Sequence, residues 1–72
     1  MQIILIGEIG QIIFGDHAGN FIRIEDDSEN TGGFLVLISP YKDFRPVYDD
    51  WVESQESLYK YFQQSQWIVN WL

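Results

Sequence analysis

Short apolar runs separated by turn-forming residues occupy most of this 72-residue chain, and this pattern is typical of β-strands. The clearest example is Phe21-Ile22-Arg23-Ile24-Glu25, in which the isoleucines are expected on one face and the charged residues on the other. Gly15 to Asn20 and Asp26 to Gly33 are rich in turn formers, and two prolines make 40–46 irregular. Five strands are predicted, over residues 2–6, 9–14, 21–25, 34–39 and 67–72.

The connection between the first two predicted strands has two interpretations. Gly7-Glu8 suits a two-residue hairpin, because glycine occupies the first central position that a type II′ turn requires. Alternatively, residues 2–14 form one long strand with a glycine bulge near 7–10.

One helix is predicted in the second half of the chain. Leu58, Tyr61 and Phe62 follow one another at intervals of three and one, so they form a single apolar stripe. Ser54 is a good N-cap for a helix that begins at residue 55, and the apolar periodicity is lost after Ser65. An earlier start near residue 51 would use Asp50 and Glu53 as a capping box. We favour the start at 55.

These elements predict an α+β fold with an antiparallel sheet of four or five strands, in which the helix packs on one face and the final strand follows it. The strands at 2–6, 34–38 and 67–72 are apolar on both faces, whereas one short helix covers a single face. The remaining apolar surface must be covered by the loop 40–50, by curling of the sheet or by another protein chain. The aromatic residues of that loop are Tyr41, Phe44 and Tyr48.

Composition indicates a single folded domain over residues 1–72, since 46% of the residues are hydrophobic and 17% are aromatic. The net charge is −7 and only four residues are basic, which argues against nucleic acid as a ligand. The chain contains no run of about 20 apolar residues. The apolar start at Met1 has no preceding basic residue and is followed by Glu8, so we expect a cytoplasmic protein without a membrane association.

Eight acidic residues in two clusters account for the negative charge. The first cluster is Glu25, Asp26, Asp27 and Glu29; the second is Asp49, Asp50, Glu53 and Glu56. In the second cluster, interaction with the positive end of the helix dipole is an alternative to a binding role. Where the clusters form an anionic surface, it would steer a cationic partner toward the domain. Tyr48, Trp51 and Trp67 are candidate aromatic anchors beside these carboxylates.

Catalytic and metal-binding chemistry is weakly indicated. His17 is the only histidine, and beside Asp16 it is best interpreted as a solvated turn residue. The segment 25–32 is rich in oxygen ligands, but an EF-hand alignment from Asp27 places Ile38 where the bidentate glutamate belongs. We therefore expect no enzyme activity, no cofactor and no metal site.

Two hypotheses for function follow. The first is a small acidic protein-interaction module that binds a basic protein, as immunity proteins and inhibitors of nucleases or toxins do; this is an analogy of charge and size. Its expected contact residues are Glu25, Asp26, Asp27, Glu29, Tyr48, Asp49, Asp50, Trp51, Glu53 and Trp67. The alternative is a homo-oligomeric structural protein whose spare apolar face pairs with a copy of itself.

Overall fold

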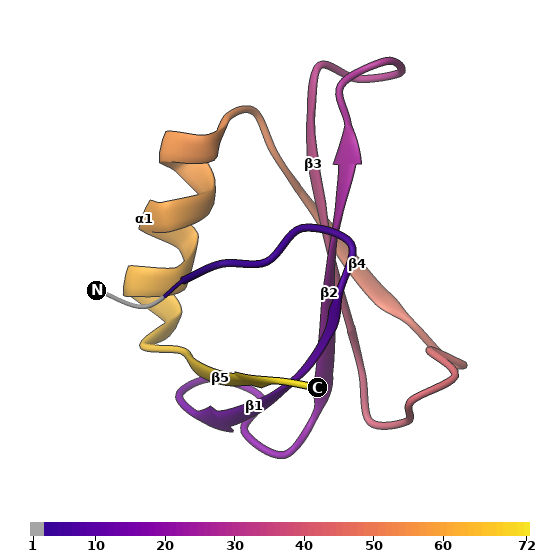
Figure 1. Cartoon of the computed structure of the whole chain (residues 1–72), viewed down its shortest axis with the longest axis vertical. Coiled ribbons are helices and arrows are strands. Elements are labelled where there is room, and N and C mark those ends of the chain that lie inside the picture. The colour runs from indigo at the N-terminus through magenta and orange to yellow at the C-terminus, as the bar shows by residue number, and fades with distance from the viewer. Residues whose placement is uncertain (1–2) are drawn as a thin grey trace.

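The computed structural model describes residues 3–72 as a five-stranded antiparallel sheet with one helix, as the sequence predicts (Figure 1). The sheet order is β4-β3-β2-β1-β5, and the helix lies between β4 and β5 along the chain. The elements are β1 (Ile9–Phe14), β2 (Phe21–Asp27), β3 (Gly33–Ser39), β4 (Tyr48–Val52), α1 (Gln55–Ser65) and β5 (Ile68–Trp71). Among the described residues no helix is both long and apolar enough to cross a membrane.

The hydrophobic core lies between α1 and one face of the sheet, which we call the inner face. The even-numbered isoleucines and valines of β2 and β3 point into it, and Leu58 and Phe62 of α1 pack against them. The buried apolar residues of this core are Ile12, Ile22, Ile24, Val36, Ile38, Val52, Leu58, Phe62 and Trp67. The alternation predicted around Arg23 is therefore confirmed, and the odd-numbered residues of β2 and β3 form the outer face.

The helix begins at the residue that its N-cap predicts and ends where the apolar periodicity is lost. Ser54 is the N-cap in extended conformation, and its side-chain oxygen accepts a hydrogen bond from the backbone N–H of Ser57 at 3.1 Å. The start at 55 is confirmed, whereas the alternative start near 51 is wrong, because residues 48–52 form β4. Gln66 closes the helix in left-handed conformation.

The N-terminal strand prediction is wrong over its described part, residues 3–6. This segment makes a single isolated bridge, between Ile6 and Ile24, and the chain reverses at Gly7, whose backbone N–H donates to the Ile24 carbonyl at 2.7 Å. Neither a hairpin at Gly7-Glu8 nor one long strand forms. Instead, the segment crosses between α1 and the sheet, where Ile4 packs against the core (Figure 1). It therefore supplies inner-face cover that the short helix lacks.

The final strand closes the core beneath the helix. Trp67, Val69 and Trp71 face inward, while Ile68 and Leu72 are exposed. The Trp67 indole Nε1–H donates to the carbonyl of Asp16 at 2.6 Å, which ties the end of the helix to the β1–β2 turn.

The outer face is covered at one end by the loop that follows β3. Phe44 of this loop is only 8% exposed, and its ring centroid lies 4.9 Å from the guanidinium carbon of Arg23. Lys42 of the same loop lies 5.7 Å from the ring centroid of Phe21. Covering by the loop is thus observed at this end, whereas the other end of the outer face, near Leu35 and β4, stays open.

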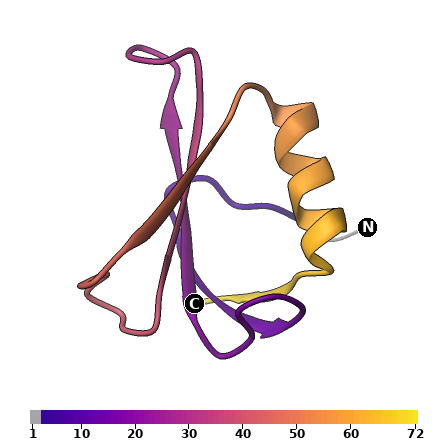
Figure 2. The ribbon, with the colours of Figure 1, turned by 180° about the vertical axis from the view of Figure 1, so that it is seen from behind.

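The chain then returns along β3 as β4, so residues 48–50, expected in the loop 40–50, belong to a strand. Figure 2 shows β4 running diagonally across the sheet, from this loop toward the start of the helix. It pairs with β3 from Ile38–Tyr48 to Phe34–Val52.

Candidate acidic interface

The two acidic clusters of the sequence lie on either side of β3. Leu35 pairs with Glu25 of β2 on one side and with Trp51 of β4 on the other. Leu37, two residues later, pairs in the same way with Arg23 and Asp49. Residues directly opposite one another in an antiparallel sheet share a face, so these side chains all project from the outer face.

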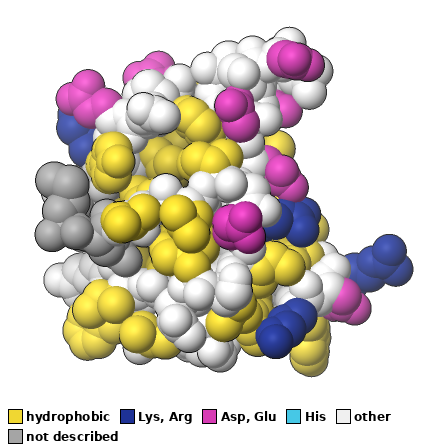
Figure 3. All heavy atoms as spheres, in the orientation of Figure 1, with side chains coloured by type: hydrophobic (Ala, Val, Ile, Leu, Met, Phe, Trp, Pro, Cys, Tyr) yellow, Lys and Arg dark blue, Asp and Glu magenta, His cyan; other side chains and the backbone are white. Residues whose placement is uncertain are grey.

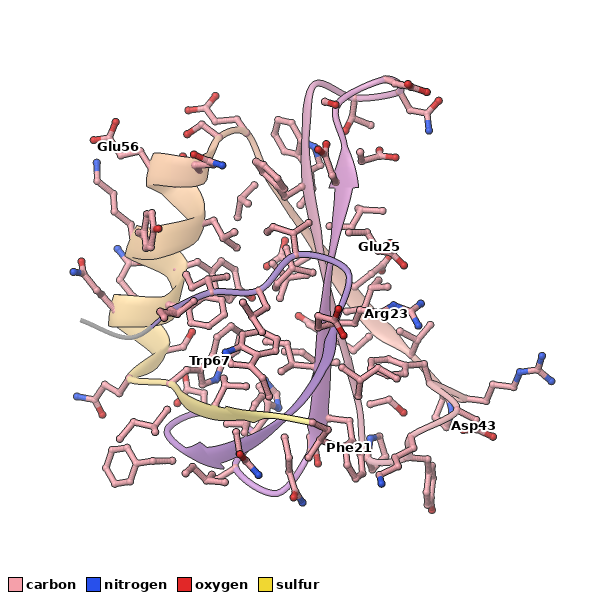
Figure 4. All side chains as sticks on the ribbon, viewed as in Figure 1. Phe21, Arg23, Glu25, Asp43, Glu56 and Trp67 are labelled. Carbon is pink, nitrogen blue, oxygen red and sulfur yellow. The ribbon has the colours of Figure 1, made fainter. Side chains whose placement is uncertain are left out.

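We call the open part of this surface the acidic face. Its residues are Glu25, Asp27, Leu35, Asp49 and Trp51. Most Asp and Glu side chains in Figure 3 lie toward the β2–β3 hairpin and the sheet side away from the helix. In Figure 4, Glu25 and Arg23 project away from α1, on the opposite side of the sheet from Glu56. The strand register therefore brings carboxylates such as Glu25 and Asp49, more than 20 residues apart in the sequence, onto one face.

The lower border of the acidic face contains an ion pair. Nε of Arg23 lies 2.9 Å from Oε1 of Glu25, and both side chains are partly exposed. Nε is buried and has no hydrogen-bond partner among the described residues, so the contact with Glu25 is ionic rather than a directed hydrogen bond. The pair compensates one carboxylate and leaves Asp49 and Asp27 without a cationic side chain in salt-bridge contact among residues 3–72.

The upper border is fixed by hydrogen bonds in the β2–β3 hairpin. The Asp27 carboxylate accepts from the Asn30 side-chain amide at 3.0 Å and from the Thr31 hydroxyl at 2.9 Å. The same Thr31 oxygen accepts a 2.8 Å hydrogen bond from the indole Nε1–H of Trp51. Hydrogen bonds through Thr31 thus link Asp27 of the first acidic cluster to Trp51, which lies within the second cluster along the sequence.

Gly33 provides the space that this arrangement needs. A Cβ atom at this position would lie 2.7 Å from Nε1 of Trp51 and would also meet the backbone carbonyl oxygen of Val52. The indole therefore lies directly on the Gly33 backbone, while 45% of the Trp51 surface remains exposed. A side chain larger than hydrogen at Gly33 would displace the ring.

Three other predicted contact residues project from the inner side of the sheet. Tyr48 is exposed and stacks at 6.1 Å on the ring of His17. The Asp50 carboxylate accepts a 2.8 Å hydrogen bond from the Tyr61 hydroxyl; burial, with this bond, raises the pKa of Tyr61 to about 12. Asp26 accepts from the backbone N–H of Ser28, which lowers the pKa of Asp26. The structure therefore does not bring these three residues onto the acidic face.

The remaining predicted residues lie at its edge or in the core. Glu29 is exposed in the hairpin turn, and Glu53 is exposed directly after β4, so both border the acidic face. The expectation that Trp67 is a surface anchor is wrong, because its side chain is 3% exposed and packs between the helix and the sheet (Figure 4). Its ring contacts those of Tyr61 and Phe62 in the core.

Sequence reasoning missed Leu35 and Thr31. The run Phe34–Ser39 signalled that β3 is apolar on both faces, but without the strand order it did not place Leu35 between the acidic strands. Nothing in the local pattern indicated that Thr31 contacts a residue 20 positions away.

A second feature is an apolar groove of about 490 Å³ on the helix side of the molecule. Phe14, Tyr59 and Ile68, all about half exposed, line it together with Gln63 and Gln66. Among residues 3–72, no charged side chain lines this groove. Within residues 3–72, no group of three or more His, Asp or Glu side chains is arranged to hold a metal ion.

No family model, curated protein or solved structure matches this chain.

Proposed function

We propose that this domain is a protein-interaction module that binds a basic protein through its acidic face. The observation that supports this proposal is the strand register, which sets Glu25 and Asp49 on opposite sides of β3, with exposed Trp51 across from Leu35. This is a mixed surface of an aromatic ring, a half-buried leucine and surrounding carboxylates. Binding hot spots commonly combine a rigid aromatic anchor with a surrounding polar rim.

Electrostatics favours a cationic partner. The chain carries a net charge of −7, and the acidic face lies where the two clusters meet. A surface of one sign raises the association rate for partners of the opposite sign, and the effect weakens with ionic strength. The partner class is therefore a protein with a basic surface, for which immunity proteins and inhibitors of nucleases or toxins provide the analogy.

Neutralising the acidic face is expected to weaken this binding. The variant carries Glu25→Gln and Asp49→Asn, and its matched control carries Glu8→Gln and Glu56→Gln, two exposed carboxylates outside the acidic face. Immobilised wild-type domain and control are expected to retain the same basic protein from a lysate of the source cells, and the acidic-face variant to lose it. With the purified partner, calorimetry should show affinity reduced about tenfold or more, equivalent to about 1.4 kcal/mol.

The wild-type affinity should also fall between 50 and 500 mM salt, since charge attraction is screened over about 10 Å at 0.1 M. Circular dichroism must show the same melting curve for variant and control, so that lost binding is not lost folding. Equal retention by the two variants, or failure of the wild type to retain any basic protein, contradicts the proposal.

The apolar groove favours a second candidate function, as a homo-oligomeric structural protein. Its half-exposed Phe14, Tyr59 and Ile68 carry no charge that would repel another copy of this acidic chain. Light scattering at micromolar concentration is then expected to give about twice the monomer mass of 8.5 kDa, and Phe14→Ser should return it to the monomer. A wild-type mass equal to that of the monomer rejects this candidate and leaves the first unaffected.

A further inference from the structure

The exposed ring of Trp51 is surrounded by carboxylates, which is the environment of a binding site for a cationic side chain. We propose that it binds an arginine of the basic partner, and that Thr31 is the positioning residue that holds the ring for it. This inference rests on the proposed function and specifies the chemistry by which the acidic face recognises its partner.

Trp51 is held in place before any partner arrives. Its indole nitrogen is bonded to Thr31 at 2.8 Å, and the ring lies on Gly33 with no space for a Cβ atom beneath it. The Thr31 hydroxyl is in turn bonded to Asp27, whose carboxylate also holds Asn30. A ring fixed in this way loses little further freedom on binding, and preorganisation of this kind increases affinity. Nearly half of the residue remains exposed.

The carboxylates around the ring define the charge of the ligand. Glu25 stands one strand across β3, in the same cross-strand row as Trp51. Asp49 precedes Trp51 by two residues and therefore projects from the same face, and Asp27 contacts the ring through Thr31. A cation over an indole is attracted by the negative face of the ring, and nearby carboxylates add to that attraction. Arginine fits best, because its planar guanidinium can stack on the ring and donate to a carboxylate at once.

The other end of the same sheet face already shows this chemistry within the chain. Arg23 stacks on Phe44 while it contacts Glu25, and Lys42 lies over Phe21. A third basic residue, Lys60, pairs with Glu56 on the helix. Because these three cations have partners elsewhere, none of them is paired with the Trp51 ring or its neighbouring carboxylates.

A short peptide tests this arginine site directly. The probe is acetyl-Gly-Arg-Gly-amide, and its control replaces arginine by citrulline, which has nearly the same shape and no charge. In ¹H–¹⁵N spectra the indole Nε1–H signal of Trp51, assigned from the Trp51→Phe variant, is expected to shift and saturate at millimolar arginine peptide. The indole signals of Trp67 and Trp71 should not move, and the citrulline peptide should shift none of the three.

Substitution of Thr31 tests the positioning role. Thr31→Val keeps the shape but removes the hydroxyl, and about a threefold to tenfold loss of peptide affinity is expected. Thr31→Ser keeps the hydroxyl and should restore the affinity, which loss of a purely structural side chain would not predict. Equal shifts with citrulline, or unchanged affinity in Thr31→Val, overturns the inference.

The two proposals fail in different ways. If Glu25→Gln with Asp49→Asn abolishes capture of the basic protein while Trp51→Ala and Thr31→Val bind it normally, the proposed function stands and the arginine site on Trp51 is rejected. If the acidic-face variant captures the protein as well as the wild type does, the proposed function itself is rejected, whatever the peptide does.

Discussion

Replacement of Trp67 by alanine is expected to remove about half of the domain's free energy of unfolding. Trp67 makes an edge-to-face contact with Phe62 at 5.0 Å and a tilted contact with Tyr61 at 5.2 Å, and its indole donates to the Asp16 carbonyl. Removing a buried tryptophan of this kind lowers the free energy of unfolding by about 3–5 kcal/mol. A domain of this size has about 4–10 kcal/mol in total. Urea unfolding followed by circular dichroism measures the loss.

Trp51→Ala is the matched control, because it removes the same side chain from an exposed position. Its ring covers Gly33 on the outer face and makes one hydrogen bond, so we expect a loss of about 1 kcal/mol and a folded domain. Binding to the basic partner should nevertheless be lost in this variant. Similar unfolding midpoints for the two variants would contradict the assignment of Trp67 to the core and Trp51 to the surface.

The helix was predictable because its signals are local. Ser54, the apolar stripe from Leu58 to Phe62 and the loss of periodicity after Ser65 all lie within about three turns, and each acts on neighbouring backbone. The strands β1, β2, β3 and β5 were found for a similar reason, since a run of apolar or alternating residues is itself a local pattern.

Residues 3–6 and 48–52 were misassigned because their conformation depends on distant partners. Residues 3–6 have strong β propensity, yet they pack across the core beside the helix and pair at one residue only. Tyr48–Val52 contains two adjacent aspartates, which β-strands generally disfavour, but pairing with β3 over five residues imposes the strand. Tertiary pairing overrides propensity in both places.

The acidic face was half predictable. The sequence showed its carboxylates, including Glu25 and Asp49, but only the strand order places them on either side of β3. Alternation also sends neighbours such as Asp50 and Asp26 to the other side, so each cluster contributes only part of its charge to one surface. Burial decides between tryptophans that look alike in sequence, and Trp51 alone of the two proposed as anchors remains accessible.

The second large loss of stability is expected from substitution of Gly15, which follows β1 and lies against the end of the helix. Gly15 has φ +98°, and a Cβ atom there would meet the backbone carbonyl oxygens of Ser65 and Gln66. The next residue, Asp16, donates its backbone N–H to Ser65 at 3.0 Å and accepts from the Trp67 indole. Gly15→Ala is therefore expected to lower the free energy of unfolding by about 2–4 kcal/mol, from backbone strain and from separation of these segments.

Gly19 offers a control with nearly the same φ and different surroundings. Its φ is +96°, but a Cβ atom at this position would meet nothing within 4 Å. Gly19→Ala should therefore show the conformational strain alone, about 1 kcal/mol. Urea unfolding of both variants separates the backbone strain from the contact with the helix end. The loss of stability in Gly15→Ala minus that in Gly19→Ala measures this contact. Equal losses would mean that the chain relaxes around Gly15, and that the close approach of the β1–β2 turn to Ser65 contributes nothing to stability.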